Sequence, residues 1–247
     1  MNVKQFLDST YLKTAKQAQL TEEQNLEVVR RTVLEAIDEE FKLIMIRPEM
    51  VEMAKKMIEE AHSYVLVGTV IDFPKGASDL RSKIDEAQEA IANGADELDF
   101  VCNYKAFQKG NVDLVRQEVL ECTRLGLANH KVVKWIIEVA ALTEKEIIQL
   151  TTLIKNVVML HFKETQYAQV FVKSSTGFYE TEDGKPNGAT IQAIMMMIEN
   201  ASPLPVKAAG GVRTYEEAVQ MIQLGVKRIG TSGAKAIAEG EISLDNY

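Results

Sequence analysis

The chain has 247 residues, of which 46% are hydrophobic and 26% are charged, a profile typical of one well-packed globular domain. Its 28 basic and 36 acidic residues give a formal net charge of −8. A chain with no basic surplus is poorly suited to nucleic acid or to an anionic membrane. We therefore expect neither as a partner, whereas a small anionic substrate needs only a local positive potential.

Cysteines and histidines are few and scattered. Cys102 and Cys122 form no CxxC pair, so we expect neither a disulfide framework nor a zinc ribbon. We expect the protein in a reducing compartment. The three histidines show no HxH or HExxH spacing, and no metal site is expected. The first residues lack the apolar core of a signal peptide, which predicts a cytosolic location.

Short apolar runs rich in β-branched residues alternate with amphipathic stretches along the chain. Continuous apolar runs without strict alternation are typical of buried parallel strands. Eight strands are predicted, at residues 6–12, 41–46, 63–71, 97–103, 132–140, 169–175, 204–209 and 226–232.

Helices are predicted between these strands. Residues 79–93 are amphipathic and end before Gly94, residues 189–200 form another, and 214–224 begin with the capping-box pair Thr214 and Glu217. Eight β/α units in about 250 residues match a (β/α)8 TIM barrel, which we predict as a single domain over 1–247. A doubly wound open sheet is the alternative, but no GxGxxG or GxxxxGK[ST] motif follows a strand.

Three lysines interrupt apolar strands: Lys134, Lys173 and Lys207 lie in predicted strands five, six and seven. Lysine is rarely buried without a partner, because removing an ammonium group from water costs several kcal/mol. In a barrel the three would converge, and both burial and neighbouring positive charges lower a lysine pKa. A partly neutral lysine can attack a carbonyl carbon. A network of structural ion pairs is the alternative.

Carboxylates lie at a matching depth. Asp99 interrupts strand four, and Asp8 is placed at the first short strand. Glu138 comes four residues after Lys134, on the same face of the predicted strand. These groups can balance the lysine charges and move protons. For Glu138 a salt bridge to Lys134 is an equally good interpretation, and Asp99 is the better catalytic candidate.

Glycine-rich segments follow the last strands. Gly210 and Gly211 join strand seven to a capped helix, residues 229–233 do the same after strand eight, and residues 174–177 follow strand six. Glycine lets backbone N–H groups approach an anion, and the loops after strands seven and eight are the recurrent phosphate site of barrels. The pattern predicts a phosphorylated carbonyl substrate.

Seven segments carry a resemblance over nearly the whole chain: LDSTYLK, TVIDFPKG, GADELDFV, VVKWIIE, VKSSTGF, VKAAGGVRT and RIGTS. They resemble the deoxyribose-phosphate aldolase family, which are class I aldolases on a TIM barrel. VKSSTGF and VKAAGGVRT are the most specific of the seven.

The resemblance implies a role for each matching residue. Lys173 corresponds to the Schiff-base lysine, Lys207 to a second lysine that tunes it, and Asp99 to a carboxylate that relays protons through a water. Lys134, Glu138 and Asp8 correspond to supporting residues of that relay. The residues implied for phosphate and substrate binding are Thr10, Gly177, Gly210, Gly211, Ser232 and Gly233.

The implied reaction is the reversible cleavage of 2-deoxy-D-ribose 5-phosphate to D-glyceraldehyde 3-phosphate and acetaldehyde, a catabolic step that needs neither metal nor organic cofactor. The sequence leaves the assembly open between a monomer, a dimer and a tetramer, and the resemblance favours a homodimer. Two alternatives stay open. One is a Schiff-base aldolase acting on a different phosphorylated or free aldose, and the other is a sugar-phosphate-binding barrel without turnover.

Some positions depart from the family pattern. Met45 stands where many relatives have cysteine, and Asp72 stands where glycine is common. The stretch from Tyr179 to Gly188 is more acidic than is usual in the family, and this acidity is the reason for considering a different aldose as the substrate. The last residue is Tyr247. Two interpretations of it are open, a role near the proton-transfer step and a frayed end at the surface.

Overall fold

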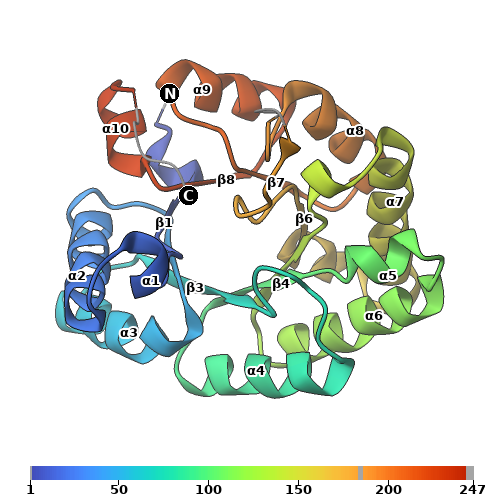
Figure 1. Cartoon of the computed structure of the whole chain (residues 1–247), viewed down its shortest axis with the longest axis horizontal. Helices are drawn as coiled ribbons and strands as arrows, with labels where there is room; N and C mark the ends of the chain where they lie inside the picture. The colour runs from blue at the N-terminus through green and yellow to red at the C-terminus, as the bar shows by residue number, and fades with distance from the viewer. Residues whose placement is uncertain (1, 183–185, 243–247) are drawn as a thin grey trace.

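A computed structural model describes residues 2–182 and 186–242 of the protein. Eight parallel strands close into a barrel in which each strand pairs with the next one along the chain and the last pairs with the first (Figure 1). The strands are Leu7–Thr10 (β1), Leu43–Ile46 (β2), Leu66–Ile71 (β3), Glu97–Val101 (β4), Val132–Ile136 (β5), Val170–Lys173 (β6), Val206–Ala209 (β7) and Arg228–Thr231 (β8). The predicted fold class, a single-domain (β/α)8 barrel, is confirmed.

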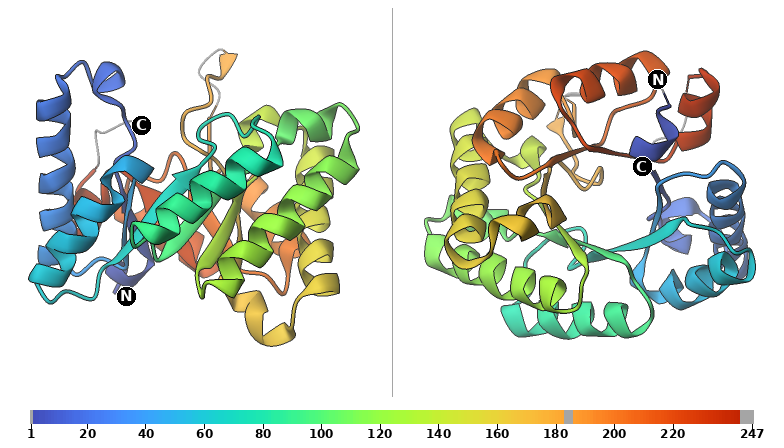
Figure 2. Two further views of the ribbon diagram at one scale, coloured as in Figure 1. Left: turned by 90° about the horizontal axis from the view of Figure 1, so that it is seen from below. Right: turned by 180° about the vertical axis from the view of Figure 1, so that it is seen from behind.

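Helices surround the barrel on all sides, as the view from behind also shows (Figure 2). They are Ala15–Ala18 (α1), Glu22–Asp38 (α2), Val51–Glu60 (α3), Leu80–Ala92 (α4), Tyr104–Gln108 (α5), Val112–Ala128 (α6), Glu144–His161 (α7), Ile191–Ala201 (α8), Tyr215–Leu224 (α9) and Ala234–Glu239 (α10). The predicted capping box is confirmed at the start of α9, where the Thr214 hydroxyl accepts a hydrogen bond from the Glu217 N–H and the Glu217 side chain accepts one from the Thr214 N–H. Among the residues described, no helix has the length and apolarity that a bilayer crossing requires.

All eight predicted strands are present, and each is shorter than the apolar run that predicted it. Strand five shows the reason. β5 ends at Ile136, because Glu138 takes a left-handed conformation with φ 58° and residues 139–141 form a 3₁₀ turn. Apolar residues continue past the ladder because the loop that follows is also packed, so hydrophobicity alone overestimates the strand.

The barrel has two apolar regions and one charged region. The larger apolar region lies between strands and helices, where Phe100 of β4 stacks on Trp135 of β5 with ring centroids 5.2 Å apart. The smaller one comprises three residues of β2 and β3 and one that follows β1, namely Leu43, Met45, Val70 and Leu12. The charged side chains come from β1 and from β4 to β8, so the functional groups gather on one side of the interior.

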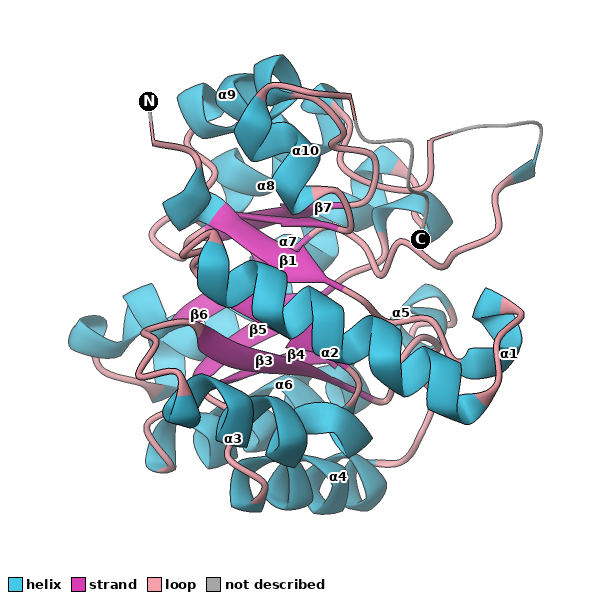
Figure 3. Ribbon diagram, turned by 90° about the vertical axis from the view of Figure 1, so that its left-hand side faces the viewer, coloured by secondary structure: helices cyan, strands magenta, loops and turns pink. Residues whose placement is uncertain are grey.

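The carboxyl ends of the strands define one face of the barrel. The short helix α1 and the described part of the segment that follows β6 both project from this end of the molecule (Figures 2 and 3). Chemistry in this fold belongs at that end, because the βα loops there can vary without disturbing the barrel.

Candidate active site

Seven ionisable side chains meet inside the barrel, and none is more than 6% exposed. They are Asp8 on β1, Glu97 and Asp99 on β4, Lys134 on β5, Lys173 on β6, Lys207 on β7 and Arg228 on β8. Glu97 and Asp99 share one face of β4 because strand side chains alternate. We call these seven residues the charge cluster.

Asp99 lies at the centre of the charge cluster. Its Oδ1 accepts a hydrogen bond from Lys134 Nζ at 2.6 Å, and its Oδ2 accepts from Lys173 Nζ and from Lys207 Nζ, each at 2.9 Å. The strand register supports this arrangement, since Asp99 pairs with Lys134 and Lys173 pairs with Lys207. The structure thus brings together the three lysines that the sequence predicted to converge.

Two further carboxylates complete the charge cluster. Asp8 lies 2.6 Å from Lys207 Nζ and accepts from Arg228 Nε at 2.7 Å. Glu97 lies 2.5 Å from Lys134 Nζ and accepts from Arg228 at 2.9 Å. Since β4 and β8 are on opposite sides of the barrel, the pair of Glu97 and Arg228 spans its interior.

Glu97 and Arg228 were missed as site residues in the sequence, although a signal was available. Both interrupt buried strands, as the three lysines do, and Glu97 is two residues from Asp99 on the same strand face. Gly230 was missed as well. A Cβ at Gly230 would lie 3.1 Å from Lys207 Cε, so glycine at this position of β8 leaves the space that the Lys207 side chain occupies.

The charge count of the cluster is uneven. Three carboxylates face three lysines and one arginine, so the cluster is electrically balanced only when one lysine is neutral. Lys207 lies between two carboxylates, Asp8 and Asp99, whereas Lys173 contacts Asp99 alone among the three. Lys173 is therefore the lysine that loses its proton most readily.

The pKa values follow this geometry. Burial lowers the pKa of Lys173 to about 8, because the attraction of Asp99 is offset by the positive charges of Lys207 and Lys134. Burial also disfavours the charged form of Lys207, but Asp8 and Asp99 outweigh it and raise the pKa of that lysine. A neutral amine beside a protonated one is the arrangement that nucleophilic attack on a carbonyl requires.

The two central carboxylates are held ionised. Burial alone would raise the pKa of Asp99, yet Lys134, Lys173 and Lys207 hold it well below its ordinary value. For Asp8 burial is likewise outweighed, by Arg228 and Lys207, and its pKa is lowered. Both carboxylates remain anions over the neutral range and keep the lysines in place.

Glu138 does not pair as the sequence predicted. It lies beyond the end of β5 in a left-handed conformation, so it does not share a strand face with Lys134. Lys134 contacts Asp99 and Glu97 instead. The Glu138 carboxyl group is buried against Ser175 and Thr176, whose hydroxyls contact its two oxygens. Both the shared face and the alternative salt bridge to Lys134 were wrong, because the strand ends two residues earlier.

The glycines predicted to bind phosphate lie where β6, β7 and β8 end. Gly177, Gly210 and Gly211 have φ angles of 80°, 81° and 87°, values that a side chain rarely adopts. The N–H of Gly233 donates to the Thr231 hydroxyl at 3.1 Å, and Ser232 is partly buried beside it. The three loops lie at the same face of the barrel as Lys173.

Hydroxyl groups near these loops brace the backbone. Ser174 donates to the Ala209 carbonyl at 2.9 Å and so ties the end of β6 to the end of β7. Thr10, at the end of β1, donates to the Asp8 carbonyl at 2.8 Å. The resemblance implied substrate binding for Thr10, and in the structure the hydroxyls of Ser174 and Thr10 both hold strand ends that carry the charge cluster.

The other side of the barrel mouth is aromatic. Phe73 and Phe178 meet edge to face with centroids 5.1 Å apart, and the Arg47 guanidinium lies 5.0 Å from the Phe73 ring centroid. Met45 is fully buried. A Cβ at Gly68 would lie 2.6 Å from Met45 Cε, so Gly68 makes room for the methionine.

Asp72 holds the loop between β3 and α4. Its carboxylate accepts from the Ser78 N–H at 2.9 Å and hydroxyl at 2.8 Å, and it lies 3.3 Å from Lys83 Nζ. The ammonium group of Lys83, which is fully buried, also donates to the carbonyls of Gly76 and Val101. Lys83, on α4, also pairs with Glu118 of α6, so Asp72 shares the positive charge of this lysine with a second carboxylate.

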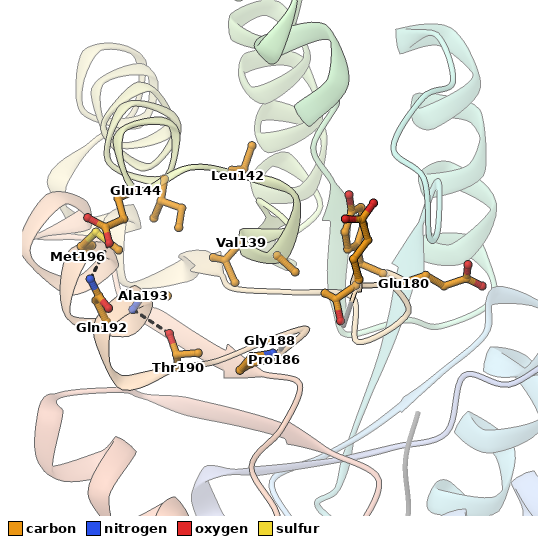
Figure 4. A pocket seen from close by; sticks show the side chains of 15 residues that line it. Val139, Leu142, Glu144, Glu180, Pro186, Gly188, Thr190, Gln192, Ala193 and Met196 are labelled. Carbon is orange, nitrogen blue, oxygen red and sulfur yellow. Dashed lines mark hydrogen bonds between the residues drawn. The ribbon is translucent and has the colours of Figure 1, made fainter. Parts of the chain in front are cut away.

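A pocket of ≈ 610 Å³ lies between the loop that follows β5, helices α7 and α8, and the described residues that connect β6 to α8 (Figure 4). It is lined in part by Val139, Glu144, Glu180 and Glu182, and none of the seven cluster residues contributes to it. Its three carboxylates disfavour an anionic ligand. The polar loops above Lys173 are better suited to a phosphate group.

Tyr247 and residues 183–185 lie outside the described residues, so the expectations for the chain end and for part of the acidic loop stay predictions. In residues 2–182 and 186–242, no group of three or more His, Cys, Asp or Glu side chains is arranged to hold a metal ion. Cys102 and Cys122 are both buried and free.

The fold and the charge cluster together define a protein of the (β/α)8 barrel class with three lysines buried around one carboxylate in its interior. The sequence comparison is more specific. The model of the DeoC/LacD family aldolases matches residues 5–237, and the chain belongs to this family.

The relatives agree with this assignment. The deoxyribose-phosphate aldolase of Thermococcus gammatolerans is 39% identical, with 83% of this chain and 85% of that protein covered. That of Streptococcus pneumoniae is 35% identical over the full length of both chains. The solved structure of deoxyribose phosphate aldolase from Aeropyrum pernix, a tetramer, superposes with a TM-score of 0.77 at 28% identity, covering 96% of this chain and 89% of that one.

The charge count makes a prediction about Lys207. Replacing it by methionine removes one positive charge, so a protonated Lys173 then balances the cluster and its pKa rises from the present value of about 8. The rate at which acetaldehyde and cyanoborohydride alkylate Lys173, followed by mass spectrometry against pH, should shift its midpoint to higher pH. The exposed Lys227→Met exchange is the control and should leave the midpoint unchanged. A midpoint that moves to lower pH in Lys207→Met would contradict the charge count.

Proposed function

We propose that this protein is a class I aldolase that cleaves 2-deoxy-D-ribose 5-phosphate reversibly to D-glyceraldehyde 3-phosphate and acetaldehyde. The observation that carries the proposal is the contrast between two neighbouring lysines. Lys173 contacts one carboxylate of the charge cluster and has a pKa of about 8, whereas Lys207 lies between two and stays protonated.

In the proposed first step the lone pair of neutral Lys173 Nζ attacks C1 of the open-chain sugar. The resulting carbinolamine loses water, and an iminium ion forms between C1 and Nζ. This cation is the electron sink of the reaction, because it accepts the electron pair of the C2–C3 bond when that bond breaks. Its charge is positive regardless of pH, so the neighbouring ammonium of Lys207 becomes more acidic at this point.

Bond cleavage requires removal of the proton from the C3 hydroxyl. In our proposal a water held by Asp99 takes this proton, and glyceraldehyde 3-phosphate leaves while an enamine remains on Lys173. Three lysines keep the pKa of Asp99 well below its ordinary value, so Asp99 holds a proton only transiently. Lys207, which is protonated, is the donor to C2 of the enamine. Hydrolysis of the new iminium then releases acetaldehyde and regenerates Lys173.

The supporting roles follow from the same geometry. Asp8, Lys134, Glu97 and Arg228 hold the two central lysines at fixed distances from Asp99. The backbone of Gly177, Gly210, Gly211, Ser232 and Gly233, together with Thr10 at the end of β1, forms the proposed substrate and phosphate site. A reducing cytosolic location and assembly into a homodimer stay predictions.

A binding protein without turnover is less consistent with the charge cluster. Binding a sugar phosphate needs no neutral amine, whereas the buried Lys173 carries a lowered pKa at the expense of desolvation. The acidic pocket lined by Glu180 and Glu182 lies outside the cluster, and it gives no specific support to another aldose.

Covalent trapping tests the Schiff base. The protein is incubated with acetaldehyde, reduced with borohydride and digested, and the adduct is located by mass spectrometry. We expect one two-carbon adduct, on Lys173, that is lost in Lys173→Ala and reduced by competing deoxyribose 5-phosphate. The exposed Lys227→Ala exchange is the control and should leave the adduct unchanged. Labelling spread over surface lysines, with none on Lys173, would refute the proposal.

The phosphate site is tested separately at Gly211. The open space at its Cβ position has room for the methyl group of Gly211→Ala, whereas its φ of 87° is one that alanine rarely adopts. We therefore expect the variant to fold and to displace the backbone that meets the phosphate. We expect kcat/KM for deoxyribose 5-phosphate to fall about tenfold, the equivalent of one hydrogen bond to a charged group, and that for unphosphorylated deoxyribose to stay unchanged.

Gly240 is the matched control for this exchange. It also has a positive φ, 78°, and open space at its Cβ position, but it ends α10 and lies away from the phosphate loops. Gly240→Ala should leave both substrates unaffected. An equal loss with both substrates in Gly211→Ala would instead mean that the loop has no part in phosphate recognition.

A further inference from the structure

The hydroxyl of Ser175 lies between two oxygen atoms that both need a hydrogen. Glu138 Oε1 is 2.7 Å away and the backbone carbonyl oxygen of Asn187 is 2.6 Å away. The same hydroxyl oxygen accepts from the Gly177 N–H at 3.0 Å. A serine hydroxyl has one hydrogen to donate, so it satisfies one of these two oxygens, and the other contact needs a hydrogen from elsewhere.

Only one arrangement of hydrogens satisfies all three contacts. If Glu138 is ionised, Ser175 has two acceptors and one hydrogen, and two oxygens at these distances repel each other without a shared proton. If Glu138 is protonated, its O–H donates to Ser175, and Ser175 donates to the Asn187 carbonyl. The Gly177 N–H then completes the bonding of the Ser175 oxygen.

The second oxygen of Glu138 fits the same pattern. Oε2 accepts from the Thr176 hydroxyl, and the Thr176 N–H is shared between the two carboxyl oxygens, 3.3 Å from Oε2 and 3.4 Å from Oε1. A hydroxyl donor at Oε2 is what the carbonyl oxygen of a neutral carboxylic acid accepts. Oε1, whose short contact is the one to Ser175, is left as the oxygen that carries the hydrogen.

We propose that Glu138 is a neutral carboxylic acid in the working enzyme and that it positions the phosphate loops through Ser175 and Asn187. The proposal rests on the function proposed above for those loops. It makes Glu138 a positioning residue, which acts through Ser175, where the family resemblance implied a member of the proton relay.

The charged surroundings of Glu138 are consistent with this state. Burial raises its pKa, and the hydrogen bonds from Thr176 and Ser175 and the charge of Lys173 offset the effect only in part. Tyr104, at the start of α5, also faces it, and burial raises the pKa of that phenol to about 12. When Lys173 loses its own proton, the positive charge that favours ionised Glu138 is removed.

Asn187 transmits the contact to two of the loops. Its side-chain amide donates to the Gly177 carbonyl at 3.1 Å. The next residue, Gly188, packs so closely on Gly210 that a Cβ there would lie 2.4 Å from the Gly210 carbonyl oxygen. Ala189 then donates to that same oxygen at 2.8 Å. The proton on Glu138 thus stabilises a segment that holds both Gly177 and Gly210.

Ionisation of Glu138 should weaken this segment. An acid is neutral below its pKa, so the Asn187 carbonyl has its hydrogen at low pH and loses it as the pH rises through the raised pKa of Glu138. The preference of the enzyme for the phosphorylated sugar should therefore fall with rising pH. Glutamine has the shape of the neutral acid and donates at every pH, so Glu138→Gln should keep that preference.

The test compares wild type, Glu138→Gln and Ser175→Ala over a pH series. The measured quantity is kcat/KM for deoxyribose 5-phosphate divided by kcat/KM for deoxyribose, in which the titration of Lys173 cancels. We expect wild type and Glu138→Gln to agree at low pH and wild type to fall about fivefold below Glu138→Gln at high pH, the equivalent of one neutral hydrogen bond. The Ser175→Ala ratio should be low throughout. The phosphate of the substrate titrates equally in all three proteins.

Infrared difference spectra give a readout that is independent of activity. Wild type minus Glu138→Gln should contain the C=O stretch of a protonated carboxylic acid at low pH, and this band should vanish as the ratio falls. Absence of the band at every pH, or a constant ratio between wild type and Glu138→Gln, would overturn the inference. A wild-type enzyme with no preference for the phosphorylated sugar would refute the proposed phosphate site instead, and the infrared band would still report on Glu138.

Discussion

One carboxylate, that of Asp99, is shared by three lysines, and the arrangement of the barrel interior depends on it. Its two oxygens lie 2.6 to 2.9 Å from three ammonium nitrogens on three different strands. Burying four such groups is costly unless each is paired, and the pairing is completed by Asp8, Glu97 and Arg228. The resulting count of three carboxylates and four bases leaves one proton loosely held, and the geometry places that proton on Lys173.

The rest of the structure keeps this cluster in position. The apolar layer between strands and helices provides the stability, while Gly230 provides space for Lys207 and Gly68 provides space for Met45 on the apolar side. Hydroxyls at the strand ends, such as Ser174, tie neighbouring strands together. If Glu138 is neutral as inferred, the site contains two groups whose neutral forms are favoured by burial: the amine of Lys173 and the carboxylic acid of Glu138.

The barrel and the centre of the charge cluster could be predicted from the sequence, because charged residues inside apolar strands are rare. Lys134, Lys173, Lys207 and Asp99 are visible for that reason, and the alternation of strands and helices predicts the barrel that makes them converge. Glu138 was misplaced because an apolar run does not show where the hydrogen-bonded ladder ends. Glu97 and Arg228 interrupt buried strands in the same way as the lysines and could have been noticed. Their pairing across the barrel and the space that Gly230 leaves for Lys207 depend on three-dimensional distances that no local pattern contains.

The central claim is that Lys173 and Lys207 differ in protonation although they are neighbours on β6 and β7. A neutron-diffraction structure of the protein at a pH above 8, the approximate pKa of Lys173, would show the hydrogens on both nitrogens directly. The account predicts three hydrogens on Lys207 Nζ and two on Lys173 Nζ. Two hydrogens on Lys207 and three on Lys173 would contradict it, and would make Lys207 the nucleophile.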